Sequence, residues 1–410
     1  MSSDSKAKYI ILVPDGMADL PIPELGDQTP LEAADTPWMD RMASSGRIGL
    51  TRTVPEGMYP GSDVAGLSIL GYRPSEVYTG RAPLEAASLG IELKPDETAF
   101  RLNLVTLDAN FTIMNDHSAD HITTAEAEQL ISAIRPYVEE EGMKLFPGVS
   151  YRNILIWPGG PSDCHTHAPH DFPGQEINSR LPSGKNSDAL LRLIIKSWKV
   201  FDNHPVNLAR VRRGQKAANS IWPWGQGKAP KMRTITERFG VRGSVVAAVD
   251  LVKGIGKYAG LTAIDVPGAT GYLDTNYQGK VKAALDSLTE GDFVLLHVEA
   301  PDEAAHSGKV DLKKKAIGDF DEKIVGPVLK GLAAFKSWRV LLMPDHRTPV
   351  STRVHTDDPV PFIILDSEQW DPEGEAKIPF SEKNAATHGT MIQHASELIE
   401  ILLEADGKKI

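Results

Sequence analysis

Three short apolar runs in this chain stop abruptly at acidic residues or histidines, and this pattern constrains the fold more than any other feature. Residues 9–13 end at Pro14-Asp15-Gly16, residues 293–298 at Glu299-Ala-Pro-Asp302, and residues 339–343 at Pro344-Asp345-His346. Continuous runs of Leu and β-branched residues without alternation are typical of strands that are buried on both faces, as in a parallel sheet. Because sites in such sheets form beyond the carboxyl ends of the strands, we expect the three polar endings to converge at one edge.

Helical segments are predicted between these strands. The segment 37–43 has Thr36 at the N-cap position, Pro37 at the first helical position and Gly46 as a stop signal. Residues 311–332 and 396–403 also have helical patterns. Strands that alternate with helices indicate βαβ units, so the predicted fold is α/β, with a mainly parallel sheet flanked by helices.

The middle of the chain has a different sequence pattern from the two ends. Amphipathic helices are predicted near 124–140 and 187–202, and loops rich in Gly and Pro lie among them. We interpret residues 98–238 as an inserted α+β domain, with residues 1–97 and 239–410 forming the core domain. The stretch 206–216 carries four basic residues and is interpreted as a solvated helix face or an interdomain contact.

Charge and cysteine content narrow the class of protein. The 410 residues carry 55 acidic against 44 basic side chains, a net charge of −11, which leaves no basic excess for a nucleic-acid partner. Cys164 is the single cysteine, so no intrachain disulfide forms and a reducing cytosol fits. The N-terminus lacks a signal-peptide pattern and no apolar stretch is long enough to span a bilayer. We therefore expect a cytoplasmic protein without a membrane partner.

Several of the polar strand ends carry metal-ligand chemistry. Asp302 and His306 are four residues apart, so on a helix both side chains point from one face. Asp345 and His346 are adjacent, His355 stands just ahead of another apolar strand, and Asp15 completes the set. Any one of these residues alone is more often a helix cap or an ordinary histidine. Together they predict a divalent metal centre, since mixed carboxylate and imidazole ligands suit Mn²⁺, Zn²⁺ or Mg²⁺.

Ser62 is the candidate nucleophile. It follows Pro60-Gly61 and precedes a helix-like apolar run, which predicts a position at a helix N-terminus, where backbone N–H groups favour an anionic oxygen. A free serine is a poor nucleophile, but coordination to a metal lowers its pKa. The surrounding residues do not match the Gly-x-Ser-x-Gly pattern, which disfavours an α/β-hydrolase triad.

Five segments carry a resemblance to a known family. They are Val13-Pro-Asp-Gly-Met17, Pro60-Gly-Ser-Asp-Val-Ala65, Pro301-Asp-Glu-Ala-Ala-His306, Pro344-Asp-His346 and His355-Thr-Asp-Asp-Pro-Val-Pro361. The set resembles the archaeal-type cofactor-independent phosphoglycerate mutases of the alkaline phosphatase superfamily, and the similarity runs in order over nearly the whole chain. It also includes Gly80-Arg-Ala-Pro-Leu-Glu-Ala-Ala87 and Val266-Pro-Gly-Ala-Thr-Gly271.

The resemblance implies an alkaline-phosphatase-like core with two divalent metal ions, manganese first and zinc, magnesium or cobalt as alternatives. Asp302, His306 and His355 would hold one ion, and Asp15, Ser62, Asp345 and His346 the other. Ser62 would take the phosphoryl group from one oxygen of phosphoglycerate and return it to the other, while the insert holds the glycerate. The implied enzyme is a glycolytic isomerase that interconverts 2- and 3-phosphoglycerate without 2,3-bisphosphoglycerate.

One segment of the insert departs from the family pattern. Where many archaeal mutases have an arginine-rich segment, this chain has Asp116-His-Ser-Ala-Asp-His121, which looks more like a bacterial subgroup proposed to phosphorylate homoserine. A phosphotransferase acting on another small alcohol, or a metal-dependent phosphatase, therefore stays open. No Gly-x-x-x-x-Gly-Lys-Ser/Thr loop for ATP is present, which counts against a kinase.

Substrate-binding residues are expected in the insert. The candidates are Asp116 and His121 from the departing segment, His170 and Asp171 from the resemblance, and Arg101, Arg152 and Lys228 as anion clamps. Arginine suits this role because its planar fork binds carboxylate or phosphate through two hydrogen bonds. The stretch from Cys164 to Asp171 holds three histidines, but its loose spacing and single cysteine disfavour a third metal site there.

Overall fold

The computed structural model describes residues 7–403, which divide into two compact units. The core unit comprises Met1–Tyr78 and Lys231–Ile410, and the insert unit comprises Thr79–Pro230. The division predicted from sequence, 98–238 for the insert, assigned the first residues after Tyr78 to the core instead. Among the described residues, no helix is both long enough and apolar enough to cross a membrane.

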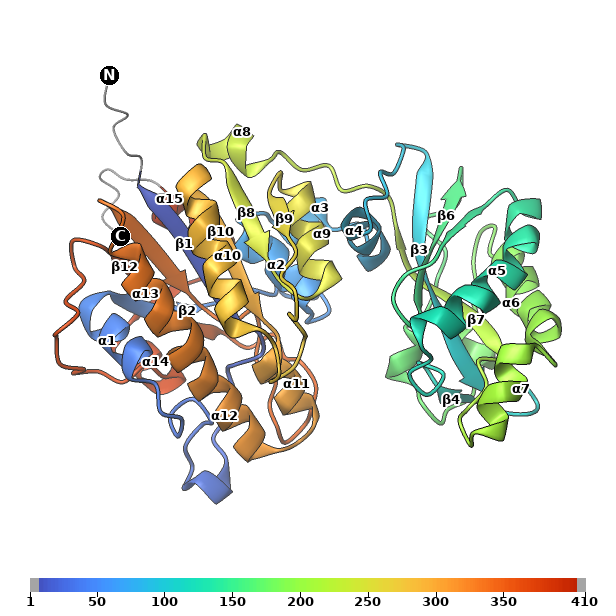
Figure 1. The fold of residues 1–410 in the computed structure, drawn as a ribbon, viewed down its shortest axis with the longest axis horizontal. Coiled ribbons are helices and arrows are strands. Elements are labelled where there is room, and N and C mark those ends of the chain that lie inside the picture. The colour runs from blue at the N-terminus through green and yellow to red at the C-terminus, as the bar shows by residue number, and fades with distance from the viewer. Residues whose placement is uncertain (1–6, 404–410) are drawn as a thin grey trace. The chain divides into compact units, whose positions relative to one another are not determined.

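An eight-stranded sheet forms the centre of the core unit (Figure 1). Its strands, in spatial order, are β13 (Thr390–Ile392), β2 (Arg47–Thr51), β12 (Val360–Asp366), β11 (Trp338–Leu342), β1 (Lys8–Pro14), β10 (Phe293–Val298), β8 (Gly243–Val246) and β9 (Thr262–Ile264). All neighbouring pairs are parallel except β11–β12 and β12–β2. The single reversed strand, β12, therefore begins at the edge where β1, β10 and β11 end.

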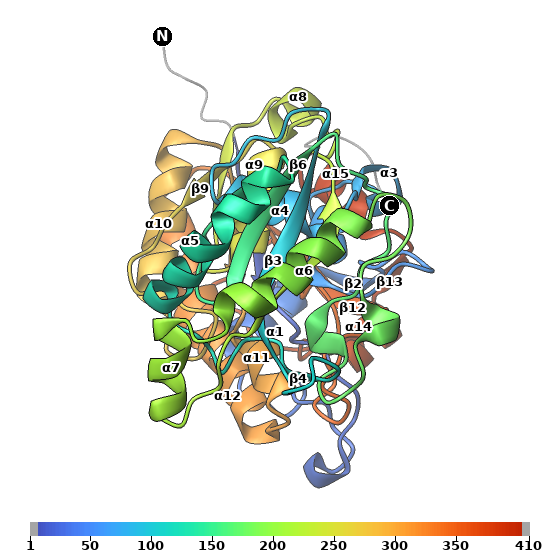
Figure 2. The ribbon, with the colours of Figure 1, turned by 90° about the vertical axis from the view of Figure 1, so that its right-hand side faces the viewer.

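Helices cover both faces of this sheet (Figures 1 and 2). The helices of the core unit are α1 (Pro37–Ser45), α2 (Ser62–Ile69), α3 (Pro74–Val77), α8 (Ile235–Phe239), α9 (Asp250–Tyr258), α10 (Tyr277–Glu290), α11 (Ala300–His306), α12 (Val310–Phe320), α13 (Gly326–Leu332), α14 (Glu382–His388) and α15 (Leu398–Leu403). One hydrophobic core joins α1, α10, α12 and α13 to Ile10 and Leu12 of β1. Ile10, Ile11 and Leu12 are all fully buried, as expected for a central parallel strand.

The long predicted helix 311–332 is interrupted. A π-helical turn, Asp321–Val325, separates α12 from α13. Both carboxylate oxygens of Asp321 accept hydrogen bonds from the start of α1, from the N–H groups of Trp38 and Met39. Thr36 does occupy the N-cap position of α1, but its hydroxyl donates to Asp40 and makes no capping bond. A residue almost 300 positions away thus caps α1, which local sequence patterns do not reveal.

The insert unit is an antiparallel sheet covered by helices. Its strands are β3 (Glu97–Leu107), β4 (Met114–Asp116), β5 (Lys144–Phe146), β6 (Arg152–Pro158) and β7 (Ser220–Gly227), with β3 paired to β4, β6 and β7. Its helices are α4 (Arg81–Ser88), α5 (Thr124–Glu140), α6 (Asp188–Phe201) and α7 (Pro205–Arg212). Helices α5 and α6 share a core with Phe100 and Leu102 of β3, whereas α4 packs with Ala99 on the opposite face.

Candidate active site

The sheet topology brings all seven predicted metal-site residues to one edge of the core unit. Asp15 follows β1, Asp302 follows β10, and Asp345 with His346 follows β11. His355 comes before β12, and this reversed strand begins where the parallel strands end. Ser62 is the first residue of α2, which follows β2 at the same edge. The convergence expected from the strand endings is therefore present in the structure.

Asp302, His306 and His355 form one side of this centre. The Nε2 atoms of the two histidines are 2.9 Å apart, and they lie 3.0 and 3.4 Å from carboxylate oxygens of Asp302. His306 Nδ1 lies 2.9 Å from the carbonyl oxygen of Arg353. Because a carbonyl only accepts, Nδ1 of His306 carries a hydrogen, so in the neutral form of the ring the lone pair is on Nε2, which faces the centre. This is the arrangement that a metal ligand requires.

Asp15, Asp345, His346 and Ser62 form the other side. His346 Nε2 lies 3.1 Å from Ser62 Oγ, 3.1 Å from Asp345 Oδ2 and 3.6 Å from Asp15 Oδ1. The rings of His346 and His355 stack with centroids 3.8 Å apart, so the two sides are contiguous. Asp15, Asp345 and His346 are almost completely buried.

Thr348, which the sequence did not single out, connects the two sides. Its hydroxyl donates to Asp302 Oδ1 at 2.6 Å and lies 3.1 Å from His346 Nδ1. A hydroxyl has one hydrogen, so when Thr348 donates to Asp302 its oxygen accepts from Nδ1–H of His346. The lone pair of His346 is then on Nε2, which faces Ser62 and the carboxylates.

Gly16 allows the close approach of the β1 turn to this centre. Its φ of +60° is in the left-handed region. A Cβ atom there would collide with Asp302 Oδ1 and would lie 2.7 Å from Thr348 Oγ1. The Gly16 N–H also donates to Asp345 Oδ1 at 3.0 Å. A glycine at this position thus lets the turn after Asp15 pack directly against the other ligands.

The donor set fits divalent cations. Asp15 Oδ1 and Asp345 Oδ2 are buried and have no hydrogen-bond partner among the described residues, and such orphaned oxygens are costly unless a cation or proton occupies the space. Burial, followed by the charge of Asp345, raises the pKa of Asp15 well above its usual range. Burial acts in the same direction on Asp302, but hydrogen bonds with His306 and His355 outweigh it and hold the pKa of Asp302 well below its usual range.

His297 and Glu299 belong to the same neighbourhood but were not assigned a role from the sequence. His297 Nε2 lies 2.8 Å from Asp15 Oδ2 and 3.8 Å from Glu299 Oε2. Burial lowers the pKa of His297 to about 4. Burial, followed by the charge of Asp302, raises the pKa of Glu299 to about 8. The available signal was a lone histidine within the otherwise apolar strand 293–298, followed directly by a glutamate.

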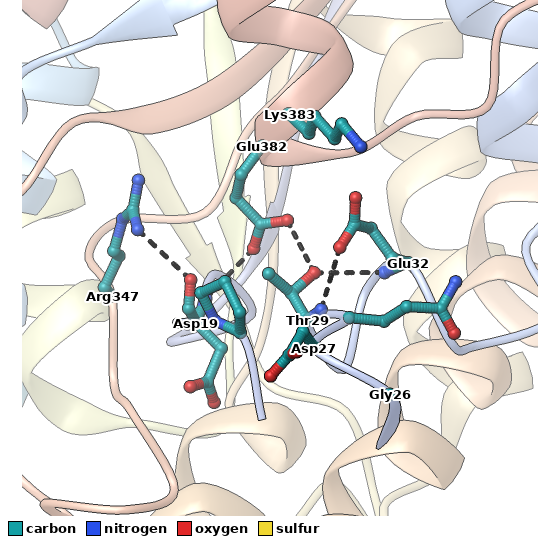
Figure 3. A pocket seen from close by; sticks show the side chains of 10 residues that line it. Asp19, Gly26, Asp27, Thr29, Glu32, Arg347, Glu382 and Lys383 are labelled. Carbon is teal, nitrogen blue, oxygen red and sulfur yellow. Dashed lines mark hydrogen bonds between the residues drawn. The ribbon is translucent and has the colours of Figure 1, made fainter. Parts of the chain in front are cut away.

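A buried ion pair supports the loop that carries these ligands. Lys313 Nζ donates to Asp19 Oδ2 at 2.7 Å and to the carbonyl oxygen of Thr348 at 2.8 Å, and both charged side chains are buried. Figure 3 shows the neighbouring pocket, of about 590 Å³, where Arg347 donates to the carbonyl of Asp19 and Glu382 accepts from Thr29. The predicted metal ligands do not line this pocket. Its polar contacts instead hold Asp19 and Arg347, which lie in the segments that follow Asp15 and His346.

The insert unit carries a separate group of basic side chains on the face of its sheet that α4 covers. We call Arg81, Arg101, Arg152, His117 and His170 the basic cluster. Its arginines act on Glu85 of α4, whose carboxylate lies 2.9 Å from Arg81 Nε and 3.0 Å from Arg101 Nε. Burial raises the pKa of Glu85, but the charges of Arg101, Arg81 and Arg152 outweigh it and lower that pKa.

Aromatic rings pack against the basic cluster. The guanidinium of Arg101 lies 4.4 Å from the ring centre of Trp224, and that of Arg152 lies 5.3 Å from the ring centre of Tyr151. The His170 ring is 5.1 Å from Trp224 and 6.0 Å from His117. Burial, followed by the charges of Arg81 and Arg101, lowers the pKa of His170 to about 3, so this ring is neutral at ordinary pH.

The structure brings some of the other predicted substrate residues close to this cluster. His121 lies 6.3 Å from Tyr151, ring centre to ring centre, and Asp171 Oδ1 lies 3.7 Å from His170 Nε2. Asp116 instead forms an ion pair of 2.8 Å with Lys216 and accepts from Ser118. Lys228 is exposed. The sequence had selected Arg101, Arg152 and His170 but assigned no role to Arg81, Glu85, His117 or Trp224.

The first two histidines after Cys164, His165 and His167, make structural contacts. His165 pairs with Ser183 in an isolated β-bridge, and Nδ1 of His167 lies 3.1 Å from the carbonyl oxygen of Arg180. Three groups of potential metal ligands occur in the described part of the chain, and they consist of Asp302 with His346 and His355, Asp15 with Asp345 and His346, and Asp15 with His297 and Glu299. All three lie in the core unit, none in this loop.

Comparison with known proteins identifies the family. A probable 2,3-bisphosphoglycerate-independent phosphoglycerate mutase from Geobacter sulfurreducens is 50% identical over 97% of this chain and 100% of its own length. The chain belongs to this mutase family. A mutase of the same name from Methanosarcina acetivorans is 48% identical over the same shares of the two chains, and the family's sequence model matches residues 43–207.

A solved structure agrees with this assignment. The cofactor-independent phosphoglycerate mutase from Thermoplasma acidophilum superposes with a TM-score of 0.63 at 25% identity, covering 97% of this chain and 98% of that one. The α/β fold and the family inferred from the strand-end motifs are thereby confirmed.

Proposed function

We propose that this chain is a 2,3-bisphosphoglycerate-independent phosphoglycerate mutase of cytoplasmic glycolysis and gluconeogenesis, which interconverts 2- and 3-phosphoglycerate through a phosphoserine at Ser62. The observation that carries the proposal is the position of Ser62 at the start of α2, with Oγ 3.1 Å from His346 Nε2. The helix N-terminus favours an anionic oxygen at this point.

The transfer would take place in two balanced steps. Ser62 Oγ bonds to phosphorus as the bond from phosphorus to one glycerate oxygen breaks, and that oxygen takes up a proton in place of the one that Ser62 releases. The second step is the reverse, with the other glycerate oxygen as the attacking group. Two divalent ions, manganese as the first candidate, would lower the pKa of the Ser62 hydroxyl and neutralise the phosphoryl oxygens.

The ligand assignment follows the two sides of the centre. Asp302, His306 and His355 would hold one ion, and Asp15, Ser62, Asp345 and His346 the other. The tautomers deduced for His306 and His346 support this division, because both present the lone pair of Nε2.

The basic cluster is our candidate for binding the anionic groups of the substrate. Three guanidinium groups face one carboxylate, Glu85, which leaves this group with an excess of positive charge. That balance suits a phosphorylated carboxylate and opposes an amino acid such as homoserine, whose ammonium group would be repelled. Although segment 116–121 lacks arginines, Arg81, Arg101 and Arg152 supply guanidinium groups from other elements.

A direct assay tests the proposal. Protein stripped of metal and reloaded with Mn²⁺ is given 3-phosphoglycerate without bisphosphoglycerate, and products are followed by phosphorus NMR. We expect 2-phosphoglycerate to accumulate with little free phosphate. Absence of 2-phosphoglycerate with every divalent ion tested would overturn the proposal, and formation of ADP from ATP and homoserine would establish the alternative kinase. Release of phosphate alone would indicate a phosphatase.

A further inference from the structure

A buried carboxylate lies among the basic side chains of the insert unit, where a site for anions would ordinarily exclude one. Glu85 is buried, and its two carboxylate oxygens lie 2.9 Å from Arg81 Nε and 3.0 Å from Arg101 Nε. A negative charge at this place repels an anionic ligand. Glu85 therefore either supports the arginines structurally or limits the charge that the basic cluster presents to its ligand.

A second buried arginine of the insert unit shows what a structural guanidinium group looks like. Arg210 donates from Nε to the carbonyl oxygen of Lys216. Its Nη atoms donate to Glu126 and to the carbonyl oxygen of Ala119. Arg101 is buried as well, but its guanidinium makes no hydrogen bond within the part of the chain that the structure describes. Buried donors without acceptors are costly, so the Arg101 guanidinium calls for an acceptor from a ligand.

The position of Arg101 is set by the sheet and by an aromatic ring as well as by Glu85. Arg101 pairs with Trp224 across β3 and β7, and its guanidinium lies 4.4 Å from the centre of the Trp224 ring. That ring is held in turn by its Nε1, which donates to Asn103 Oδ1 at 3.0 Å. Asn103 is two residues after Arg101, so the pleat of β3 places both side chains on one face. Support of Arg101 therefore does not account for Glu85 by itself.

The ionisation of the basic cluster gives Glu85 a second role. Burial raises the pKa of Glu85, but the charges of the three arginines outweigh it and lower that pKa, so the carboxylate is ionised. Burial lowers the pKa of His117, and it lowers the pKa of His170 to about 3, so the charge of the cluster comes from its arginines. Glu85 removes one unit from that positive charge.

We propose that Glu85 is a specificity-determining residue, which weakens the hold of the basic cluster on a doubly charged phosphoryl group more than on a singly charged carboxylate. The repulsion between Glu85 and a ligand grows in proportion to the charge of the ligand, so it counts twice for a dianion. The inference rests on the proposed function, in which the phosphoryl group reacts at Ser62 and the basic cluster holds the carboxylate that remains. A cluster that bound the phosphoryl group instead would keep it away from Ser62.

Equilibrium binding of two probes to metal-free protein tests this selectivity. Sulfate is a tetrahedral dianion that resembles a phosphoryl group, whereas D-glycerate carries only the carboxylate. Both are titrated by calorimetry at one constant ionic strength. We expect Glu85→Gln, which removes the charge but keeps the size of the side chain, to bind D-glycerate about fivefold more tightly than the wild type. The same variant should bind sulfate about 25-fold more tightly, since the effect of one charge is doubled in free energy.

The matched control is Glu128→Gln. Glu128 is an exposed glutamate of α5, which packs on the other face of the insert sheet from α4, and the substitution changes the net charge equally. Its affinity for both probes should equal that of the wild type. Weaker binding of both probes by Glu85→Gln would show that Glu85 only supports the arginines. That result, or a change for sulfate no larger than the change for D-glycerate, would overturn the proposal.

A second measurement uses only the wild type, in case Glu85→Gln folds poorly. With Glu85 in place, sulfate should bind no more tightly than D-glycerate despite its double charge. Tighter binding of sulfate, or no binding of either probe, would refute the inference. Neither readout involves turnover, so a chain that fails the mutase assay can still show this selectivity, and an active mutase without it would contradict only the role of Glu85.

Discussion

In the core unit, buried carboxylates and imidazoles are packed together, whereas in the insert unit three guanidinium groups surround one carboxylate. We call the edge of the core sheet where the seven predicted metal-site residues meet the metal edge. There, Asp15 and Asp345 have oxygens without hydrogen-bond partners among the described residues. At the basic cluster, Glu85 is paired with both Arg81 and Arg101. This contrast is why we propose cations as ligands of the first site and anions as ligands of the second.

Each site should therefore depend on its ligand in a different way. The metal edge is electrostatically incomplete by itself, so ions should contribute both to chemistry and to stability. At the basic cluster, Arg81 and Arg101 are already paired with Glu85 and aromatic rings pack against Arg101 and Arg152, so an anion should affect affinity more than folding. The predictions below test this contrast.

The largest effect is expected at the nucleophile. Ser62→Ala removes the oxygen that would carry the phosphoryl group but leaves the carboxylate and imidazole ligands, so turnover should fall by at least about 10⁴-fold while metal still binds. Turnover and metal content would be measured on the same preparation. Ser75→Ala, at an exposed serine of α3, should be indistinguishable from the wild type. Residual activity of Ser62→Ala within tenfold of the wild type would contradict the covalent mechanism.

A large structural effect is expected at Arg210 in the insert unit. Its side chain is completely buried, pairs with Glu126 and donates to the carbonyl of Ala119. Residues 119–121 all have positive φ, a strained conformation that these bonds stabilise. Arg210→Met should lower the free energy of unfolding of the insert unit by about 3–5 kcal/mol, measured by chemical denaturation. Arg212→Met, at an exposed arginine of α7, is the control, and equal stability of the two variants would contradict this role.

Arg210 also marks a limit of the sequence-based predictions. Basic residues of 206–216 were interpreted as a solvated face or interdomain contact, which is wrong for Arg210 because a carboxylate and carbonyl groups distant in sequence neutralise it. Helices with local caps were predicted closely, and α5 spans Thr124–Glu140 with a capping box formed by Thr123 and Glu126. The π turn at Asp321 was missed because it serves α1, through contacts that only the tertiary structure creates.

The two sites also differ in how far the sequence could predict them. The convergence of the predicted ligands at one edge could be inferred because parallel strands bring residues that directly follow apolar runs to one place. The basic cluster could not be assembled from sequence, because Arg101 and Trp224 meet through antiparallel pairing of β3 with β7, and Glu85 arrives on α4. His297 was overlooked because a single histidine within a strand is ordinarily a structural residue.

A smaller effect is expected at the basic cluster. Arg101→Met removes a guanidinium held between Glu85 and Trp224, so the KM for phosphoglycerate should rise by about 10–100-fold, the loss expected for one charge-assisted hydrogen-bonding group. The melting temperature should also fall, because Arg101 is buried beside Glu85, but by less than in Arg210→Met since Arg81 continues to pair with Glu85. Steady-state kinetics beside the Arg212→Met control would measure this. A fall in kcat with unchanged KM would contradict a binding role.

The smallest expected effect is a difference in the pH dependence of stability between the metal-free and the metal-loaded protein. Burial and Asp302 raise the pKa of Glu299 to about 8, and in His306 the hydrogen bond with Asp302 outweighs burial and raises the pKa to about 9. Both groups hold protons more tightly when folded than when unfolded, so stability falls as pH rises, up to about pH 8 for Glu299 and up to about pH 9 for His306. The loss is at most about 1.4 kcal/mol per proton and pH unit, and less for the partly exposed His306. By calorimetry, the melting temperature of metal-free protein should therefore fall over this range, while Mn²⁺ bound as proposed, in place of the His306 proton, should weaken or reverse the fall. A metal-free melting temperature that rises from pH 7 to 9 would show that the metal edge does not retain these protons when its ions are removed.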